Sequence, residues 1–362
     1  MDIEHVEKTI VLCGFLIGLI FGFISQRSRF CFLGSIADFY IYKNSSRLGL
    51  YLLSLISSIL GVTLLTEFNL LNPKNSLYFT NGHGFFPYSV GGLIFGVGMA
   101  LCSGCPASSV IKLGEGNLKA LMVLFVTGVT AIITMRGLFS FLRLKIIELE
   151  RIFNDYYSNI LAFFSTEYDS SMLLRNLILI LASVFFLYNL KKNSINKQKI
   201  FTGLLIGFCV SSGWYLTGAY GFLIEHPITL DSQYLMTNSG GPESLSFIGP
   251  TAYTLELLMY TSDSSKYVSY GIMVFLGTFL GSFVSALFTK NINIDFFRKK
   301  NDFINHFVGA MFMGFGGVLA SGCSIGNGLT GLSLGSPNSL IAVISIIMGG
   351  LIGLRYLENK VT

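Results

Sequence analysis

Two cysteine-containing segments carry the residues of this chain that could do chemistry. The stretch Gly96–Cys105 recurs as Gly314–Cys323 at a constant offset of 218, and each copy ends in Ser-Gly-Cys. A thiol is a weak hydrogen-bond donor and a polarizable contact for another sulfur atom. A cysteine placed where an apolar stretch breaks, once in each half of the chain, predicts a pore built from two related halves with thiols at its waist.

The elements that must position these cysteines are predicted to be membrane helices. The 362 residues are 52% hydrophobic and 12% charged, with a mean hydropathy of +0.66, whereas soluble domains carry about 25% charged residues. The 40 glycines would let such helices pack closely. The net charge of +5 is modest and gives no sign of nucleic-acid binding. Composition therefore predicts an all-α integral membrane protein whose surroundings are the lipid bilayer, with no nucleic-acid partner.

Apolar runs of about 17–25 residues predict about nine transmembrane helices. These runs lie near residues 9–24, 48–66, 86–104, 118–135, 172–190, 200–213, 268–288, 305–322 and 338–355. Three of them, 86–104, 200–213 and 305–322, are shorter or interrupted by glycine. The acidic start of the chain is unlike a cleavable signal peptide, so the first helix is expected to be retained.

The distribution of Lys and Arg predicts which way these spans face. Basic residues gather in alternate loops, at 27–47, 112–119, 191–199 and 290–300, and acidic residues gather in most of the others. Because short cytoplasmic loops collect Lys and Arg, the N-terminus is predicted outside and the C-terminus in the cytoplasm. Segment 136–171 holds charges of both signs and is expected to form an outer amphipathic connection.

With this topology the two Ser-Gly-Cys stretches run in opposite directions, which predicts an inverted repeat. Repeat one would cover about 9–135, a connecting segment and helix about 136–190, and repeat two about 200–357, all within one transport domain, 1–362. Inverted repeats place their site near the membrane midplane, at broken helices. Matching Gly14 and Gly18 with Gly203 and Gly207 sets Tyr215 in the place that Cys31 holds in the first half. The predicted site thus offers three thiols, from Cys31, Cys105 and Cys323, and one phenol.

Cys102 leaves a second interpretation open. It precedes Cys105 by three residues, so Cys-Ser-Gly-Cys also resembles a dithiol redox or metal motif. The second copy has Ala320 at that position and no His or acid lies nearby, which argues against a metal site. The rival function from another class is a membrane thiol-disulfide oxidoreductase that uses Cys102 and Cys105. Cys13 and Cys209 are predicted to be small buried apolar side chains.

Four elements of the sequence resemble the YeeE/YedE sulfur-transport family. They are Arg29–Gly34 followed by Asp38, Ser103–Pro106, Gly213–Gly218 and Ser321–Gly328. The resemblance covers essentially the whole chain and implies a multi-pass protein of the bacterial inner membrane that takes up thiosulfate, is not an enzyme and has no cofactor. It further implies an hourglass shape with short re-entrant helices, and passage of the anion along Cys31, Cys105 and Cys323. A selenium compound or another sulfur species is the alternative substrate.

The family also implies a partner, a small TusA-like sulfurtransferase called YeeD on the cytoplasmic side. The hairpin of Lys112, Glu115 and Asn117 is a candidate docking surface for it, or an ordinary solvated loop. Arg29 and Cys102 are possible accessory residues of the path, and plain anchoring at the cytoplasmic side is the other interpretation of Arg29.

The chemistry of the predicted path suits an anion. A dianion cannot cross hydrocarbon bare, and paired lysines would hold it too tightly to release it. Weak neutral donors in series, thiols and the amides at helix starts, would let it pass. On this reasoning the path would be completed by polar or backbone groups from Ser103, Gly104, Ser321, Gly322, Gly326 and Asn327.

Overall fold

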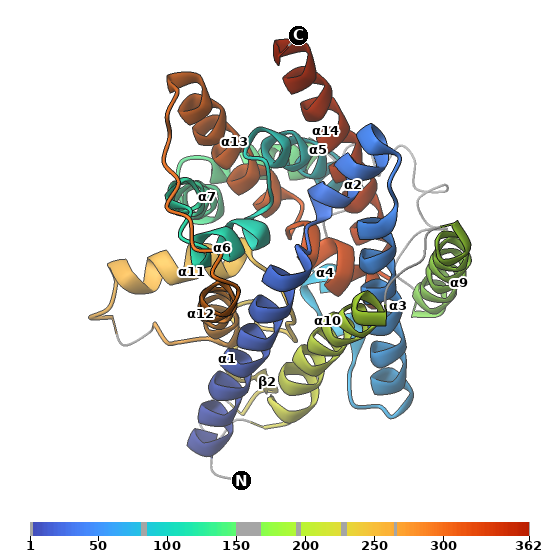
Figure 1. Ribbon diagram of the computed structural model, residues 1–362. Helices are drawn as coiled ribbons and strands as arrows, with labels where there is room; N and C mark the ends of the chain where they lie inside the picture. The colour runs from blue at the N-terminus through green and yellow to red at the C-terminus, as the bar shows by residue number, and fades with distance from the viewer. Residues whose placement is uncertain are drawn as a thin grey trace.

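The computed structural model describes residues 3–80, 85–149, 168–192, 197–225, 230–263 and 266–361. Nine long helices dominate these ranges (Figure 1): α1 (Ile3–Ser28), α3 (Ser46–Glu67), α5 (Phe85–Leu101), α7 (Leu118–Arg136), α9 (Tyr168–Lys192), α10 (Lys197–Tyr215), α12 (Tyr270–Thr289), α13 (Lys300–Leu319) and α14 (Pro337–Val361). The paired strands among the described residues are β1 (Phe222–Leu223) and β2 (Gln233–Tyr234), which are antiparallel.

Short helices connect the long ones. They are α2 (Phe32–Tyr42), η1 (Pro73–Asn75), α4 (Leu77–Thr80), α6 (Pro106–Gly114), the π-helix η3 (Leu216–Tyr220), α11 (Ile248–Met259) and the π-helix η4 (Gly326–Gly331). Residues 140–149 are also helical, at the start of the predicted outer connection. Residues 150–167 of that connection lie outside the described residues, and 168–171 form the start of α9.

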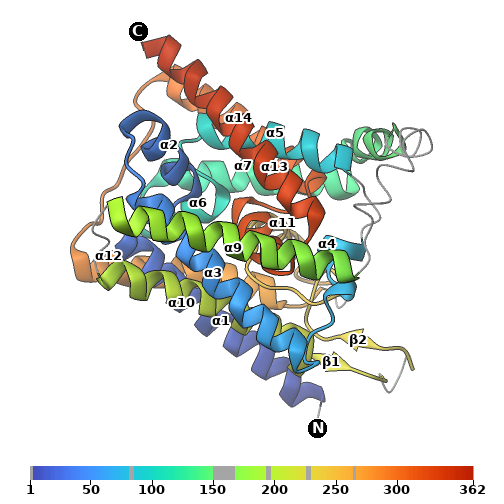
Figure 2. The same cartoon turned by 90° about the vertical axis from the view of Figure 1, so that its right-hand side faces the viewer.

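Eight helical segments of the described chain are long and apolar enough to cross a membrane, which confirms an all-α membrane protein. They correspond to eight of the nine predicted runs. The ninth run lies in α9, where the described side chains form the shorter apolar stretch Met172–Phe186. Figure 2 shows α9 lying across α3 at the outside of the helical bundle. Leu173, Leu177 and Ile180 of α9 are each more than half exposed, as apolar side chains that face lipid would be.

Glycines bring two pairs of helices into backbone contact. A Cβ atom at Gly18 of α1 would lie 2.3 Å from the carbonyl oxygen of Val274 on α12. A Cβ atom at Gly207 of α10 would lie 2.4 Å from Cβ of Ser57 on α3. Close packing of this kind needs residues without a side chain. The matched glycines of α1 and α10 therefore have the same role: each allows its helix to pack closely against a neighbour, α12 in one case and α3 in the other.

The helices that carry the Ser-Gly-Cys segments, α5 and α13, cross each other through two further close contacts. A Cβ atom at Gly98 would lie 2.5 Å from the carbonyl oxygen of Gly309, and one at Gly316 would lie 2.6 Å from that of Gly91. By the offset of 218, Gly316 is the position equivalent to Gly98, and Gly309 is the position equivalent to Gly91. Each contact is thus the counterpart of the other, as a two-fold arrangement of the halves requires. The inverted repeat itself stays a prediction.

Hydrogen bonds gather basic loops at one end of the molecule. Gln26 Nε2 donates to Glu115 Oε1 at 3.1 Å, and the backbone N–H of Asn293 donates to the Glu115 carbonyl at 3.0 Å. Arg355 near the C-terminus donates to the Tyr40 hydroxyl. This end is called the basic end below; it comprises loops 27–31, 43–46, 112–119 and 290–300. Figure 2 shows the N-terminus on the side of the molecule away from the loop that joins α12 to α13.

Candidate functional site

The three candidate cysteines follow the same backbone turn. The residue two positions before each one has a left-handed backbone, with φ of 52° at Arg29, 53° at Ser103 and 52° at Ser321. In each case the next N–H donates back to a carbonyl five residues earlier, such as Gly104 to Met99 and Gly322 to Gly317. This is the hydrogen-bonding of a helix C-terminal cap, and it ends α1, α5 and α13. Each cysteine therefore stands where a long helix stops.

Each cysteine also begins a new helix. Cys31 and Cys105 are the N-caps of α2 and α6, and Cys323 precedes the helical turn that leads into η4. Backbone N–H groups donate to sulfur at two of them, Gly34 to Cys31 Sγ at 3.4 Å and Gly326 to Cys323 Sγ at 3.2 Å. The first amides of a helix carry partial positive charge. Thiols and electropositive amides are thus presented together.

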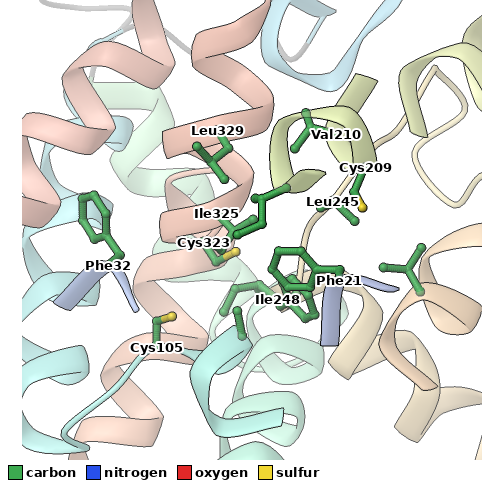
Figure 3. Close-up of a cluster of buried hydrophobic side chains, with 14 of the residues drawn as sticks. Phe21, Phe32, Cys105, Cys209, Val210, Leu245, Ile248, Cys323, Ile325 and Leu329 are labelled. Atoms are coloured by element: carbon green, nitrogen blue, oxygen red, sulfur yellow. The ribbon is translucent and has the colours of Figure 1, made fainter. Parts of the chain in front are cut away.

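The structure brings these three thiols into one region. Cys105 and Cys323 are buried, with 1% and 0% exposure, while Cys31 is only half-buried. The Cys105 thiol is a neighbour of those of Cys31 and Cys323. Figure 3 shows Cys105 and Cys323 in the same cluster of buried side chains, with Phe32 beside them. Cys31 therefore gives this buried pair its contact with the basic end.

Tyr51 links the Cys31 segment to the Cys323 segment and was not predicted. The rings of Phe30 and Phe32, on either side of Cys31, lie 5.8 and 5.0 Å from its ring. Its hydroxyl donates to the carbonyl oxygen of Ser324 at 3.4 Å. A Cβ atom at Gly328 would lie 2.1 Å from that hydroxyl, so glycine is required there. The glycines around Asn327 were the available signal that bulky groups approach this loop.

A second group of polar atoms converges on Gly326. A Cβ atom at that position would lie 3.1 Å from the Tyr78 hydroxyl, 3.2 Å from Ser246 Oγ and 3.7 Å from Cys323 Sγ. A buried polar atom nearby, Asn327 Oδ1, has no hydrogen-bond partner among the described residues. Buried polar groups are nearly always partnered. Such atoms mark a place suited to a polar ligand or water.

A cavity of about 410 Å³ reaches this site from the side away from the basic end. It extends to Ser321 and Gly322, which directly precede Cys323. Its lining combines hydroxyl groups with charged side chains: Tyr78, Ser239, Ser244, Ser246, Tyr253, Arg136, Arg143 and Glu243. The cavity therefore offers a polar approach to the buried thiols.

Two of the charged groups around this cavity have evident partners. The Glu243 carboxylate accepts a hydrogen bond from the Ser239 backbone N–H at 2.6 Å, and burial raises the pKa of this carboxyl above its usual value. Arg136 forms an ion pair with Glu256, which also binds Lys266 at 2.6 Å. Arg143 has no ion pair among the described residues.

Cations also stand at the basic end of the cysteine cluster. A Cβ atom at Gly34 would lie 3.1 Å from Arg47 Nη1 and 3.7 Å from Cys31 Sγ, so guanidinium and thiol are neighbours. Arg47 also pairs with Asp38 at 3.3 Å. Lys112 Nζ donates to the carbonyl oxygen of Ser103 at 2.7 Å. The buried thiols are thus approached by positive charge from both ends.

Other predicted residues lie apart from the cluster. Tyr215 is 44% exposed at the end of α10, whereas its neighbour Trp214 is buried, donates from Nε1 to Ser333 Oγ at 3.3 Å and lies 6.4 Å from the Tyr78 ring. Arg29 is exposed at the basic end. Among the lining predicted after each cysteine, Asn327 is fully buried and Ser103 is exposed.

Cys102 is held by α13. Its Sγ donates to the carbonyl oxygen of His306 at 3.2 Å and lies 2.8 Å from where a Cβ atom of Gly309 would be. All six cysteines are free thiols, so Cys102 and Cys105 form no disulfide. Cys209 is buried beside Val210 and Leu245, away from the Cys105–Cys323 pair (Figure 3). The contacts of Cys102 are those of a packing residue.

Membrane-spanning helices around a buried polar site, next to a polar cavity, define a multi-pass membrane protein. The chain belongs to the sulphur transport (YeeE/YedE) family, because the family model described as "Sulphur transport" matches residues 27–352. It is 26% identical to the thiosulfate transporter TsuA of Escherichia coli K12, over 94% of this chain and 93% of that one. It is 24% identical to the thiosulfate transporter TsuA of Spirochaeta thermophila, over 93% and 96%. These findings confirm the resemblance.

Proposed function

We propose that the protein imports thiosulfate, passing the anion from the 410 Å³ cavity along Cys323, Cys105 and Cys31 in turn. One observation carries this proposal: three thiols, each at the start of a helix after the same turn, lie together between the cavity and the basic end. The two relatives named as thiosulfate transporters support the choice of substrate.

The proposed mechanism is non-covalent. The oxygens of thiosulfate accept hydrogen bonds from amides at the starts of the helices that follow the cysteines, while its terminal sulfur contacts the thiols. The side chains of Tyr51, Tyr78 and Ser324, near Cys105 and Cys323, end in hydroxyl groups and carry no formal charge. Neutral donors bind a dianion weakly enough to release it, because hydrogen bonds between protein and ligand largely replace those to water. Positive charge at the two ends then limits the cost of entry and exit.

We place the basic end in the cytoplasm, because short cytoplasmic loops are rich in Lys and Arg. The C-terminus then lies inside and the N-terminus outside, in the bacterial inner membrane. The proposed partner, a TusA-like sulfurtransferase, would receive the anion at this end, near Lys112 and Glu115. The inverted repeat is supported by the reciprocal contacts of α5 with α13.

The proposal is tested by growth and uptake. A bacterial sulfur auxotroph that lacks its own sulfate and thiosulfate importers receives the gene and is supplied with thiosulfate, sulfate or sulfite as sole sulfur source. We expect growth on thiosulfate and saturable uptake of labelled thiosulfate; selenium compounds are tested as competitors of that uptake. Growth on sulfate but not on thiosulfate would overturn the proposal. A strain carrying the empty vector is the control.

A further inference from the structure

We infer that Arg143 captures the oxyanion end of the substrate in the cavity, so that a first binding site precedes the three cysteines. The inference rests on the proposed function, in which a thiosulfate-like dianion enters from this side. It assigns a specificity-determining role to a residue of the connection between the two halves.

The helix at residues 140–149 presents Arg143 to the cavity. Arg143 and Ile147 both line it, and residues four positions apart lie on the same face of a helix. The Arg143 side chain is half-buried, and its Nε is buried without a hydrogen-bond partner among the described residues. A guanidinium N–H withdrawn from water without a partner is costly. An anionic ligand in the cavity would supply that partner.

The other cation of the cavity is already committed. Arg136 is paired with Glu256, and Lys266 Nζ binds the same Glu256 oxygen at 2.6 Å. Glu243, the carboxylate among the lining residues, accepts from Ser239 N–H and forms no ion pair with Arg143. Of the two arginines that line the cavity, Arg143 therefore has its charge available for a ligand.

The chemistry of a guanidinium matches the proposed ligand. Its planar array of N–H groups donates in pairs to neighbouring oxygens of a carboxylate or phosphate, and the oxygens of a sulfonate offer a similar pair of acceptors. Thiosulfate held in this way keeps its terminal sulfur free. Tyr78 and Ser246 line the cavity and also approach Gly326 and Cys323, so they continue the route inward. Arg143 would thus select for a sulfonate-like end before any thiol is reached.

The experiment compares Arg143→Gln with Lys145→Gln in the full-length protein. Lys145 lies on the same helix and carries the same charge, but it sits over the Phe141 ring at 4.4 Å and does not line the cavity. For initial rates of labelled thiosulfate uptake, we expect Arg143→Gln to raise KM about tenfold with Vmax within about twofold, because a charge-assisted hydrogen bond is lost. Lys145→Gln should leave both constants within about twofold. Arg143→Lys, which keeps the charge but loses the paired geometry, should give an intermediate KM.

Two outcomes are decisive. An unchanged KM in Arg143→Gln, or an equal rise in Lys145→Gln, would overturn the assignment. Thermal unfolding and size-exclusion profiles of the purified variants identify a folding defect. If Arg143→Gln does not fold, the KM of Arg143→Lys decides the assignment, and an unchanged KM would overturn it. If the wild-type protein itself takes up no thiosulfate, the proposed function fails; if it does and the Arg143 variants match it, only this inference fails.

Discussion

The Ser103–Cys105 and Ser321–Cys323 turns have the same backbone conformation, but different side chains form hydrogen bonds to them. Both have a left-handed serine, with φ of 53° and 52°. The first is closed by Lys112, whose Nζ donates to the Ser103 carbonyl at 2.7 Å near the exposed basic end. The second is closed by Asn327, whose Nδ2 donates to the buried Ala320 carbonyl at 3.0 Å. A repeated scaffold thus carries a charge at one turn and a neutral amide at the other.

The helices that follow the two turns differ as well. Cys105 leads into the regular helix α6, which has Pro106 at its first position, whereas Cys323 leads into the π-helix η4. π-Helical turns are frequent at functional sites. Glycines of η4 leave room for the hydroxyls of Tyr51 and Tyr78. On the proposed path, this difference predicts that substrate recognition is concentrated at the second turn and release at the first.

Removing the thiols at the two turns should change thiosulfate uptake more than any other substitution considered. We expect Cys323→Ala to raise the KM for thiosulfate uptake about tenfold or more and Cys105→Ala chiefly to lower Vmax, because each removes one polar partner worth about 1–3 kcal/mol. Ser variants, which keep a donor, should retain more activity than Ala variants. The measurement is initial uptake of labelled thiosulfate at matched expression. Unchanged kinetics in both Ala variants would contradict a path along these thiols.

Neutralising the charge at the first turn should have a smaller effect. Lys112→Gln shortens the side chain and removes the positive charge beside Ser103, so we expect Vmax to fall about threefold with KM unchanged, as for a weak exposed electrostatic interaction. Lys299→Gln, an exposed substitution at the same end, is the matched control. A rise in KM in place of a fall in Vmax would reverse the roles assigned to the two turns.

The smallest effect is expected at Cys102. Its thiol bonds to His306 and packs on Gly309, so Cys102→Ala should leave thiosulfate uptake within about twofold and lower stability by about 1 kcal/mol. Cys102→Ser, which keeps a donor, should recover part of the lost stability. Uptake assays and thermal unfolding measure the two effects. A dithiol oxidoreductase would instead lose its activity entirely in either variant.

Much of the fold could be predicted because each membrane-spanning helix is recognisable from its own apolar run, without knowledge of its neighbours. Apolar length predicts the spans, and the abundance of glycine predicts close helix packing, which Gly18 of α1 and Gly207 of α10 show. Tyr215 illustrates the limit. A shift of one residue turns a helical side chain by about 100°, and the buried side chain at this place is Trp214, with Tyr215 exposed.

Several residues of the site could not be found from sequence because tertiary packing brings them there. Tyr51 comes from α3 and Tyr78 from α4, and neither lies near a cysteine in the chain. Arg143 follows α7 in a segment with charges of both signs, so nothing in the sequence distinguishes it from the other charged residues there. The Cys105 and Cys323 turns could be found because Ser-Gly-Cys at a helix end is a local pattern, whereas Cys31, in Arg29-Phe30-Cys31, was placed by matching the two halves.

The crossing of α5 with α13 has the form of a subunit interface within a single chain. Gly98 meets Gly309 while Gly316 meets Gly91, so each patch contacts its own counterpart. Between separate subunits such reciprocity defines a closed, isologous dimer, with no free surface to recruit further copies. Covalent linkage fixes the stoichiometry of the two surfaces at one to one. On the proposed inverted repeat, it also lets each half diverge alone, which identical subunits cannot do, and the different contacts of Lys112 and Asn327 are what such divergence would produce.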